Sequence, residues 1–224
     1  MRISPSVESL SRVNPEGAML ERSPFPHAIE DGIFPSDVVA QAEREFPAWG
    51  HPAWSVFWNE RELKGICNNM EAMGPSVKTL LHLMCRSEFI RKLEVLMGIP
   101  KLIPDIHGGG MHIVPLGGKL GMHTDFNRGV NGYRRLNGLL FLNSSWGGGG
   151  DLELWSKDKT TKVKIAPLAN RFVVFETSSR SFHGHPYPLA CPPDRCRKSL
   201  AVYYFTKEPP ADVDEPRDTV FLEA

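Results

Sequence analysis

The sequence predicts a mainly β protein of the α+β class, in which a jelly-roll core packs against helices from the N-terminal third. Two observations support this prediction. After Ile99, short strand-like runs alternate with Gly and Pro at near-regular spacing, which is typical of a sandwich or barrel and not of parallel βαβ units. Before Ile99, apolar residues recur at helical spacing in segments 36–46 and 75–98.

The N-terminal third is expected to supply a strand, helices and a loop. The first twenty-odd residues are polar and aperiodic, as in a loose arm or a short edge strand. "PFPHAIEDGIF" then predicts a strand and turn, and "SDVVAQAEREF" predicts a helix with Ser36 as its N-cap. Residues 47–74 lack periodicity and predict a long, lid-like loop beside a site. Residues 75–98 predict two helices that break at 86–87 and end at Gly98.

The remainder of the chain is expected to form the β core. The predicted strands lie in "GGMHIVPL", "KLGMHTDF", "RLNGLLFLN", "GDLELWS", "TKVKIAPL", "NRFVVFETS" and "SLAVYYFT". We therefore expect residues 1–224 to form a single domain. It would consist of an N-terminal arm with helices and a lid-like loop (1–104), a jelly-roll core (105–208) and a C-terminal tail (209–224).

Composition narrows the class of protein. Lys plus Arg and Asp plus Glu number 26 each, so no basic excess indicates nucleic acid. The N-terminus lacks an apolar secretory segment, and no apolar run reaches the length of a membrane span. The four cysteines are irregularly spaced without a C-x-x-C motif, which favours reduced thiols. We expect a cytoplasmic protein that acts on a small molecule and binds neither nucleic acid nor membrane, with its oligomeric state left open.

The stretch "GMHTDFN" raises the possibility of a metal site. If it is a strand, His123 and Asp125 point to the same face. About sixty residues later, "ETSSRSFHGHPYPL" supplies His183 and His185, and a jelly roll can bring either one to the first pair. Two histidines and one carboxylate on one face of a metal form the ligand set of non-haem Fe(II) oxygenases.

The strand predicted in "RCRKSLAVYYFT" begins with cations. Arg197 and Ser199 share one face of it. An arginine at the mouth of an apolar barrel needs an anion to offset its desolvation, and a guanidinium with a neighbouring hydroxyl suits a carboxylate. The distal carboxylate of 2-oxoglutarate would meet this requirement.

These motifs together resemble those of the 2-oxoglutarate/Fe(II)-dependent oxygenases, in the prolyl-4-hydroxylase-like branch. The order is H-T-D, then F-H-G-H, then R-K-S before an aromatic strand, and the resemblance covers roughly residues 105–208. It implies a double-stranded β-helix in which His123, Asp125 and His183 are the catalytic iron ligands. It also implies Fe(II), 2-oxoglutarate and O2 as cofactor and cosubstrates.

The same resemblance implies a cosubstrate site. Arg197, assisted by Ser199, would bind the far carboxylate of 2-oxoglutarate, and Asn137 stands where that branch has a polar side chain that contacts the cosubstrate. Val114 occupies a position where many relatives have a cosubstrate-binding tyrosine, so His112 or Asn137 is expected to complete that contact.

Other residues are candidates of lower specificity. A long loop before the cationic strand keeps Arg195 as an alternative to Arg197, although the R-x-S spacing favours Arg197. Asn127 and Arg128 follow the H-x-D motif, and Trp58 lies in the predicted lid; all three are candidates for substrate contact.

The expected activity is hydroxylation of an unactivated C–H bond of a small polar metabolite, with release of succinate and CO2. The balanced charge and the Trp-, Asn- and Arg-containing loop favour a compact ligand. The alternatives are a prolyl hydroxylase of proteins or peptides, a non-catalytic binding protein, and a cupin-like metal-binding protein that is independent of 2-oxoglutarate.

Overall fold

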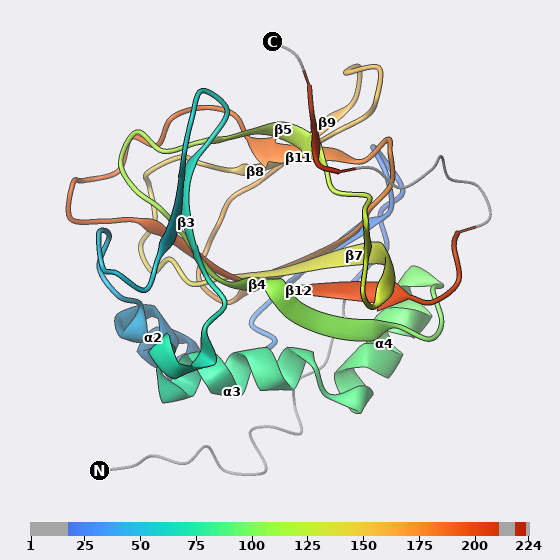
Figure 1. Ribbon diagram of the computed structural model, residues 1–224, viewed down its shortest axis with the longest axis horizontal. Coiled ribbons are helices and arrows are strands. Elements are labelled where there is room, and N and C mark those ends of the chain that lie inside the picture. The colour runs from blue at the N-terminus through green and yellow to red at the C-terminus, as the bar shows by residue number, and fades with distance from the viewer. Residues whose placement is uncertain (1–17, 211–217, 223–224) are drawn as a thin grey trace.

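Two antiparallel β-sheets face each other, and helices cover the outer face of the larger sheet (Figure 1). The computed structural model describes residues 18–210 and 218–222, without the side chain of His107. The N-terminal arm predicted from the sequence lies almost entirely outside these residues. The predicted mainly β class and the jelly roll are confirmed.

The larger sheet has eight strands in the order β1-β10-β7-β12-β4-β3-β2, with β6 paired to β7. Its strands are β1 (His27–Asp31), β2 (Ser55–Trp58), β3 (Leu63–Cys67), β4 (Ile103–Val114), β6 (Arg128–Gly129), β7 (Gly132–Phe141), β10 (Arg171–Glu176) and β12 (Arg197–Thr206).

The smaller sheet has five strands in the order β13-β5-β11-β8-β9. Its strands are β5 (Leu120–Thr124), β8 (Leu152–Trp155), β9 (Lys162–Ile165), β11 (Phe182–His185) and β13 (Val220–Phe221). Apart from β8 and β9, neighbours in this order are far apart in sequence, so the sheet brings distant side chains onto one inner face.

The helices form where their apolar stripes predict them. They are α2 (Ser36–Glu45), α3 (Pro75–Met84) and α4 (Ser87–Met97), with a short 3-10 turn η2 (Met70–Ala72). Gly98 adopts a left-handed conformation (φ 68°) and ends α4 as expected. The expectation for Ser36 is wrong: Pro35 holds the N-cap position, Ser36 is the first helical residue, and no side-chain hydrogen bond caps the helix.

Two further expectations require correction. The predicted loop 47–74 contains the hairpin of β2 and β3, which extends the larger sheet beside β4. All four residues of β2 are exposed, so this strand lacks the apolar alternation that would have revealed it. The β core does not begin at residue 105 as expected, because β1, β2 and β3 precede that position. It does not end at residue 208 either, because β13 lies in the expected C-terminal tail.

The main apolar core lies between the helices and the larger sheet. Leu80, Leu93 and Leu136 are fully buried there. The hydroxyl of Tyr204 on β12 donates to the Met84 carbonyl at 3.0 Å, which links the sheet to α3. A smaller cluster that includes Phe141 and Phe175 lies on the inner side, between the sheets. Within the described part of the chain, no helix has the length and apolar character needed to cross a membrane.

Two residues of α4 provide a matched test of this packing. Leu93→Ala removes a fully buried side chain and should lower the free energy of unfolding by about 2–5 kcal/mol. Val95→Ala changes a side chain that is 85% exposed and should change that free energy by less than about 0.5 kcal/mol. Chemical denaturation of both variants checks the orientation of the helix, and equal effects would contradict it.

Candidate metal centre

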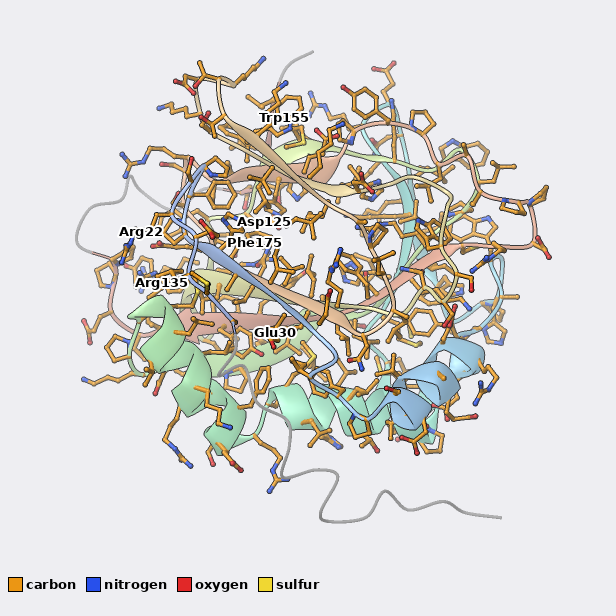
Figure 2. The ribbon with its side chains drawn as sticks, turned by 180° about the vertical axis from the view of Figure 1, so that it is seen from behind. Arg22, Glu30, Asp125, Arg135, Trp155 and Phe175 are labelled. Carbon is orange, nitrogen blue, oxygen red and sulfur yellow. The ribbon has the colours of Figure 1, made fainter. Side chains whose placement is uncertain are left out.

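The inner face of the smaller sheet brings two histidines and an aspartate together. His123 on β5 and His183 on β11 are cross-strand partners, with ring centroids 4.3 Å apart. Asp125 follows the end of β5 and lies in the space between the sheets (Figure 2). One of its carboxylate oxygens, Oδ2, is 3.5 Å from His123 Nε2 and 3.4 Å from His183 Nε2. The three ligand atoms lie within 4.8 Å of one another, so one metal ion could contact all of them.

Hydrogen bonds to the backbone orient both imidazoles for metal binding. The Nδ1 atoms of His123 and His183 contact the carbonyl oxygens of Gly121 and Ser181 at 2.8 and 3.1 Å. A carbonyl only accepts, so Nδ1 of each ring carries a proton, and Nε2, the atom nearer Asp125, is the nitrogen that can bind a metal. Burial and the neighbouring His123 lower the pKa of His183 to about 4, although Asp125 opposes this shift, so the His183 ring is neutral at pH 7.

The Asp125 carboxylate is ionised and held from two sides. Burial raises its pKa, but the charge of Arg134 and the contacts with His123 and His183 outweigh burial and hold the pKa well below its usual range. Arg134 Nη2 is 3.2 Å from Oδ2, and the Thr219 hydroxyl donates to Oδ1 at 2.9 Å. Two imidazoles with one carboxylate fit the ligand preference of Fe(II) and leave other positions of the ion open.

Asn137 on β7 lies beside this cluster. Its Oδ1 accepts a hydrogen bond from Arg134 Nε at 2.7 Å, and its Nδ2 is 3.4 Å from His183 Nε2. Because Arg134 occupies the amide oxygen, the NH2 group is directed toward the cluster. A donor in that place is suited to an oxygen atom of a metal-bound ligand.

Arg197 is a buried cation at the start of β12. It is 6% exposed, lies over the ring of Phe141, and donates from Nε to the Gly150 carbonyl at 2.8 Å. Burial lowers its pKa to about 10, so the guanidinium remains charged at pH 7. No carboxylate of the described residues forms an ion pair with it. The charge of Asp151 acts on Arg197 only from a distance, and a buried cation without a direct ion pair favours an anionic ligand.

Two buried histidine nitrogens near Arg197 lack hydrogen-bond partners. The Nε2 atom of His112 and the Nδ1 atom of His185 are buried without a hydrogen bond. Burial first, and the charges of Lys64 and Arg134 next, lower the pKa of His112 to about 3. Burial and then the charges of Arg197 and Lys64 hold the pKa of His185 well below its usual value. Ser199 is buried on β12 opposite His112. A polar dianion such as 2-oxoglutarate could pair with the buried guanidinium and form hydrogen bonds with these unsatisfied groups.

Arg195 is placed differently from Arg197. It lies in the loop before β12, donates to the backbone carbonyls of Ser144 and Ser145, and contacts the Trp146 ring. Its donors are therefore used by the protein itself. His185, the alternative to His183, is not part of the three-residue cluster.

A cavity of about 570 Å³ opens onto the cluster. His123, Asp125, Asn127 and Arg128 line it, so two of the three substrate candidates lie beside the ligand atoms. Trp58 does not line it. That side chain is 83% exposed and borders a separate depression with Leu116. A larger depression of about 980 Å³ lies elsewhere and includes none of the three clustered residues.

Several residues of the site were not expected from the sequence. They are Phe57, Lys64, Arg134, Tyr203 and Thr219, all of which line the cavity. Arg134 stacks on the Tyr203 ring with its guanidinium carbon 3.4 Å from the ring centroid. Arg134 precedes the strand predicted in "RLNGLLFLN", and strand alternation places Arg134 and Arg135 on opposite faces without deciding which one points inward.

Comparison with known proteins identifies the family. Residues 109–205 match the family model described as the 2OG-Fe(II) oxygenase superfamily, and they contain the whole cluster together with Arg197. Residues 109–205 therefore form a domain of the 2OG-Fe(II) oxygenase type. The predicted resemblance is confirmed, and the chain is a 2-oxoglutarate-dependent iron dioxygenase with Fe(II), 2-oxoglutarate and O2 as cofactor and cosubstrates. No curated protein matches the chain significantly.

Solved structures share the fold of this dioxygenase. A prolyl-4-hydroxylase from Pseudomonas putida is 17% identical, with a TM-score of 0.59 over 89% of this chain and 99% of that chain. A Trichoplax adhaerens prolyl hydroxylase, solved with a fragment of the oxygen degradation domain of hypoxia inducible factor, is 17% identical, with a TM-score of 0.62 over 89% and 88%. A Burkholderia pseudomallei protein of the 2OG-Fe(II) oxygenase family is 13% identical, with a TM-score of 0.53 over 92% of each chain.

Proposed function

We propose that this dioxygenase hydroxylates an aliphatic C–H bond of a small polar metabolite at the 570 Å³ cavity, with His123, Asp125 and His183 as the iron ligands. The observation that carries the proposal is the convergence of the three ligand atoms within 4.8 Å beside that cavity. When bound, Fe(II) with 2-oxoglutarate and O2 supplies the oxidising power: one oxygen atom becomes the hydroxyl group, and the other enters succinate as CO2 leaves.

The protein groups bind and orient the reactants. Arg197 holds the distal carboxylate of 2-oxoglutarate through its guanidinium, with Ser199 beside it and His112 offering an unpartnered ring nitrogen. Asn137, whose amide oxygen is held by Arg134, would offer its NH2 group to the bound cosubstrate. The apolar cluster between the sheets, which includes Phe141, keeps water away from the Arg197 guanidinium.

The cavity supports a compact, polar substrate. Its volume lies within the roughly 300–1,000 Å³ range of small-molecule sites. Its wall carries both signs of charge: Lys64 and Arg128 line it together with Glu62 and Asp218, and Lys64 pairs with Glu62 at 2.8 Å. Arg128 can pair with a substrate carboxylate or phosphate. Opposite charges around one cavity favour a metabolite that itself carries several polar groups.

One observation favours a second function, hydroxylation of a prolyl residue in a peptide. β2 is one of the two edge strands of the larger sheet, and its Val56, Phe57 and Trp58 are exposed. Phe57 also reaches the cavity wall. An exposed apolar edge beside a catalytic cavity is a place where an extended peptide can add to a sheet. Proteins of similar fold include prolyl hydroxylases.

A competition assay separates the two functions. Amino acids, sugars and metabolite pools are tested beside proline-containing peptides for their ability to stimulate succinate formation. We expect stimulation by polar metabolites, reduced by Arg128→Ala, because this variant removes a cation from the cavity wall. Stimulation by peptides alone, lost when their proline is replaced, would establish the peptide function instead. Val95→Ala serves as the control variant because Val95 is exposed on α4.

A further inference from the structure

The C-terminal strand lies against the strand that carries His123. β13, the red segment near the C label in Figure 1, pairs antiparallel with β5. In this pairing Val220 lies opposite Thr124, and Phe221 lies opposite His123. The Leu222 amide donates to the Met122 carbonyl at 2.8 Å and continues this pairing. The sequence indicated only a tail here, yet its residues line the same cavity as the candidate ligands.

Thr219 fixes one oxygen of the Asp125 carboxylate. Its hydroxyl donates to Oδ1 at 2.9 Å, while Oδ2 is the oxygen close to both histidines. A hydrogen bond on Oδ1 stops rotation of the carboxylate and presents Oδ2 to the point where the three ligand atoms meet. Partners of this kind strengthen the binding of a metal because they orient its ligands in advance.

Phe221 supports the His123 ring. The two rings are 5.3 Å apart at an interplanar angle of 36°. The guanidinium of Arg61 lies 5.3 Å from the centroid of the same Phe221 ring. Gly121 leaves room for the ring, because a Cβ atom there would lie 3.2 Å from Phe221 Cδ1. His123 is thus held by a hydrogen bond on one nitrogen and by an aromatic face.

We propose that Thr219 and Phe221 are positioning residues of the metal centre, so that the C-terminal strand is part of the site and not only an edge of the sheet. This inference rests on the proposed role of His123 and Asp125 as ligands. A purely structural role for β13 would require the backbone pairing and would not depend on the Thr219 hydroxyl, so replacing that hydroxyl distinguishes the two roles.

The test is titration of the full-length chain with Mn²⁺, followed by calorimetry, together with the visible spectrum of the Co²⁺ form. Thr219→Val keeps the shape and removes the donor, and it should bind Mn²⁺ about 10- to 100-fold more weakly with a changed Co²⁺ spectrum. Thr219→Ser restores the donor and should bind within a few-fold of the wild type. Thr79→Val removes a hydroxyl bonded to the Pro75 carbonyl on α3 and should bind as the wild type does.

Thermal unfolding without metal checks that each variant folds, and Thr219→Ala replaces Thr219→Val if the latter does not. Suppose that the wild type binds Mn²⁺ tightly and that the folded variant without the hydroxyl binds it equally well, with an unchanged Co²⁺ spectrum. That result would overturn this inference and leave the proposed ligand set intact. A wild-type chain that binds no Mn²⁺ would overturn the proposed ligand set and this inference with it.

Discussion

Replacing His123, Asp125 or His183 with alanine should each remove most of the affinity of the chain for Fe²⁺ or Mn²⁺. Each change deletes one of three ligand atoms that lie within 4.8 Å of one another. Loss of a direct ligand should exceed the 10- to 100-fold effect of losing an outer partner, so we expect at least a roughly 100-fold weaker affinity. Elemental analysis of the purified proteins and Mn²⁺ titration measure this.

His185→Ala is the matched control for the ligand assignment. His185 is buried only two residues after His183 but lies outside the cluster. It should therefore keep about one metal ion per chain. If His185→Ala lost the metal and His183→Ala retained it, the ligands would be assigned to the wrong histidine.

The second large effect is expected at Arg197. Arg197→Ala removes a charged, buried donor group, and a charge-assisted hydrogen bond contributes about 1.5–3 kcal/mol. The affinity for 2-oxoglutarate should therefore fall about 10- to 100-fold, while Mn²⁺ binding is retained, because the guanidinium is not a metal ligand. Calorimetric titration of the Mn²⁺-loaded protein with 2-oxoglutarate under argon measures this affinity.

Arg195→Ala provides the comparison. Its guanidinium donates to carbonyls of the loop at Ser144 and Ser145, so 2-oxoglutarate affinity should stay within a few-fold of the wild type. A large loss in this variant, with none in Arg197→Ala, would move the cosubstrate site out of the space between the sheets.

The sequence allowed prediction of those parts of the site that lie on single strands. His123 and Asp125 are two residues apart, and Arg197 and Ser199 share a face of β12, so local periodicity was enough to group them. Helix ends were predictable where a glycine could adopt the left-handed conformation, as at Gly98. The resemblance to the oxygenases then related His183 to the first pair.

The remaining features depend on contacts between distant segments. Thr219 reaches Asp125 across 94 residues, and nothing near Thr219 in the sequence indicates this hydrogen bond. Arg134 could not be distinguished from Arg135, because the register of β7 decides which one faces inward. The β2–β3 hairpin was taken for a loop because β2 is exposed on both faces and shows no alternation.

The most direct test of the central claim is a crystal structure of the full-length chain with Mn²⁺ and 2-oxoglutarate, grown without oxygen. We expect the metal to be bound by Nε2 of His123, Nε2 of His183 and a carboxylate oxygen of Asp125. We also expect the distal carboxylate of 2-oxoglutarate to contact the Arg197 guanidinium. A metal bound elsewhere, or a 2-oxoglutarate carboxylate paired with Arg195, would contradict this assignment.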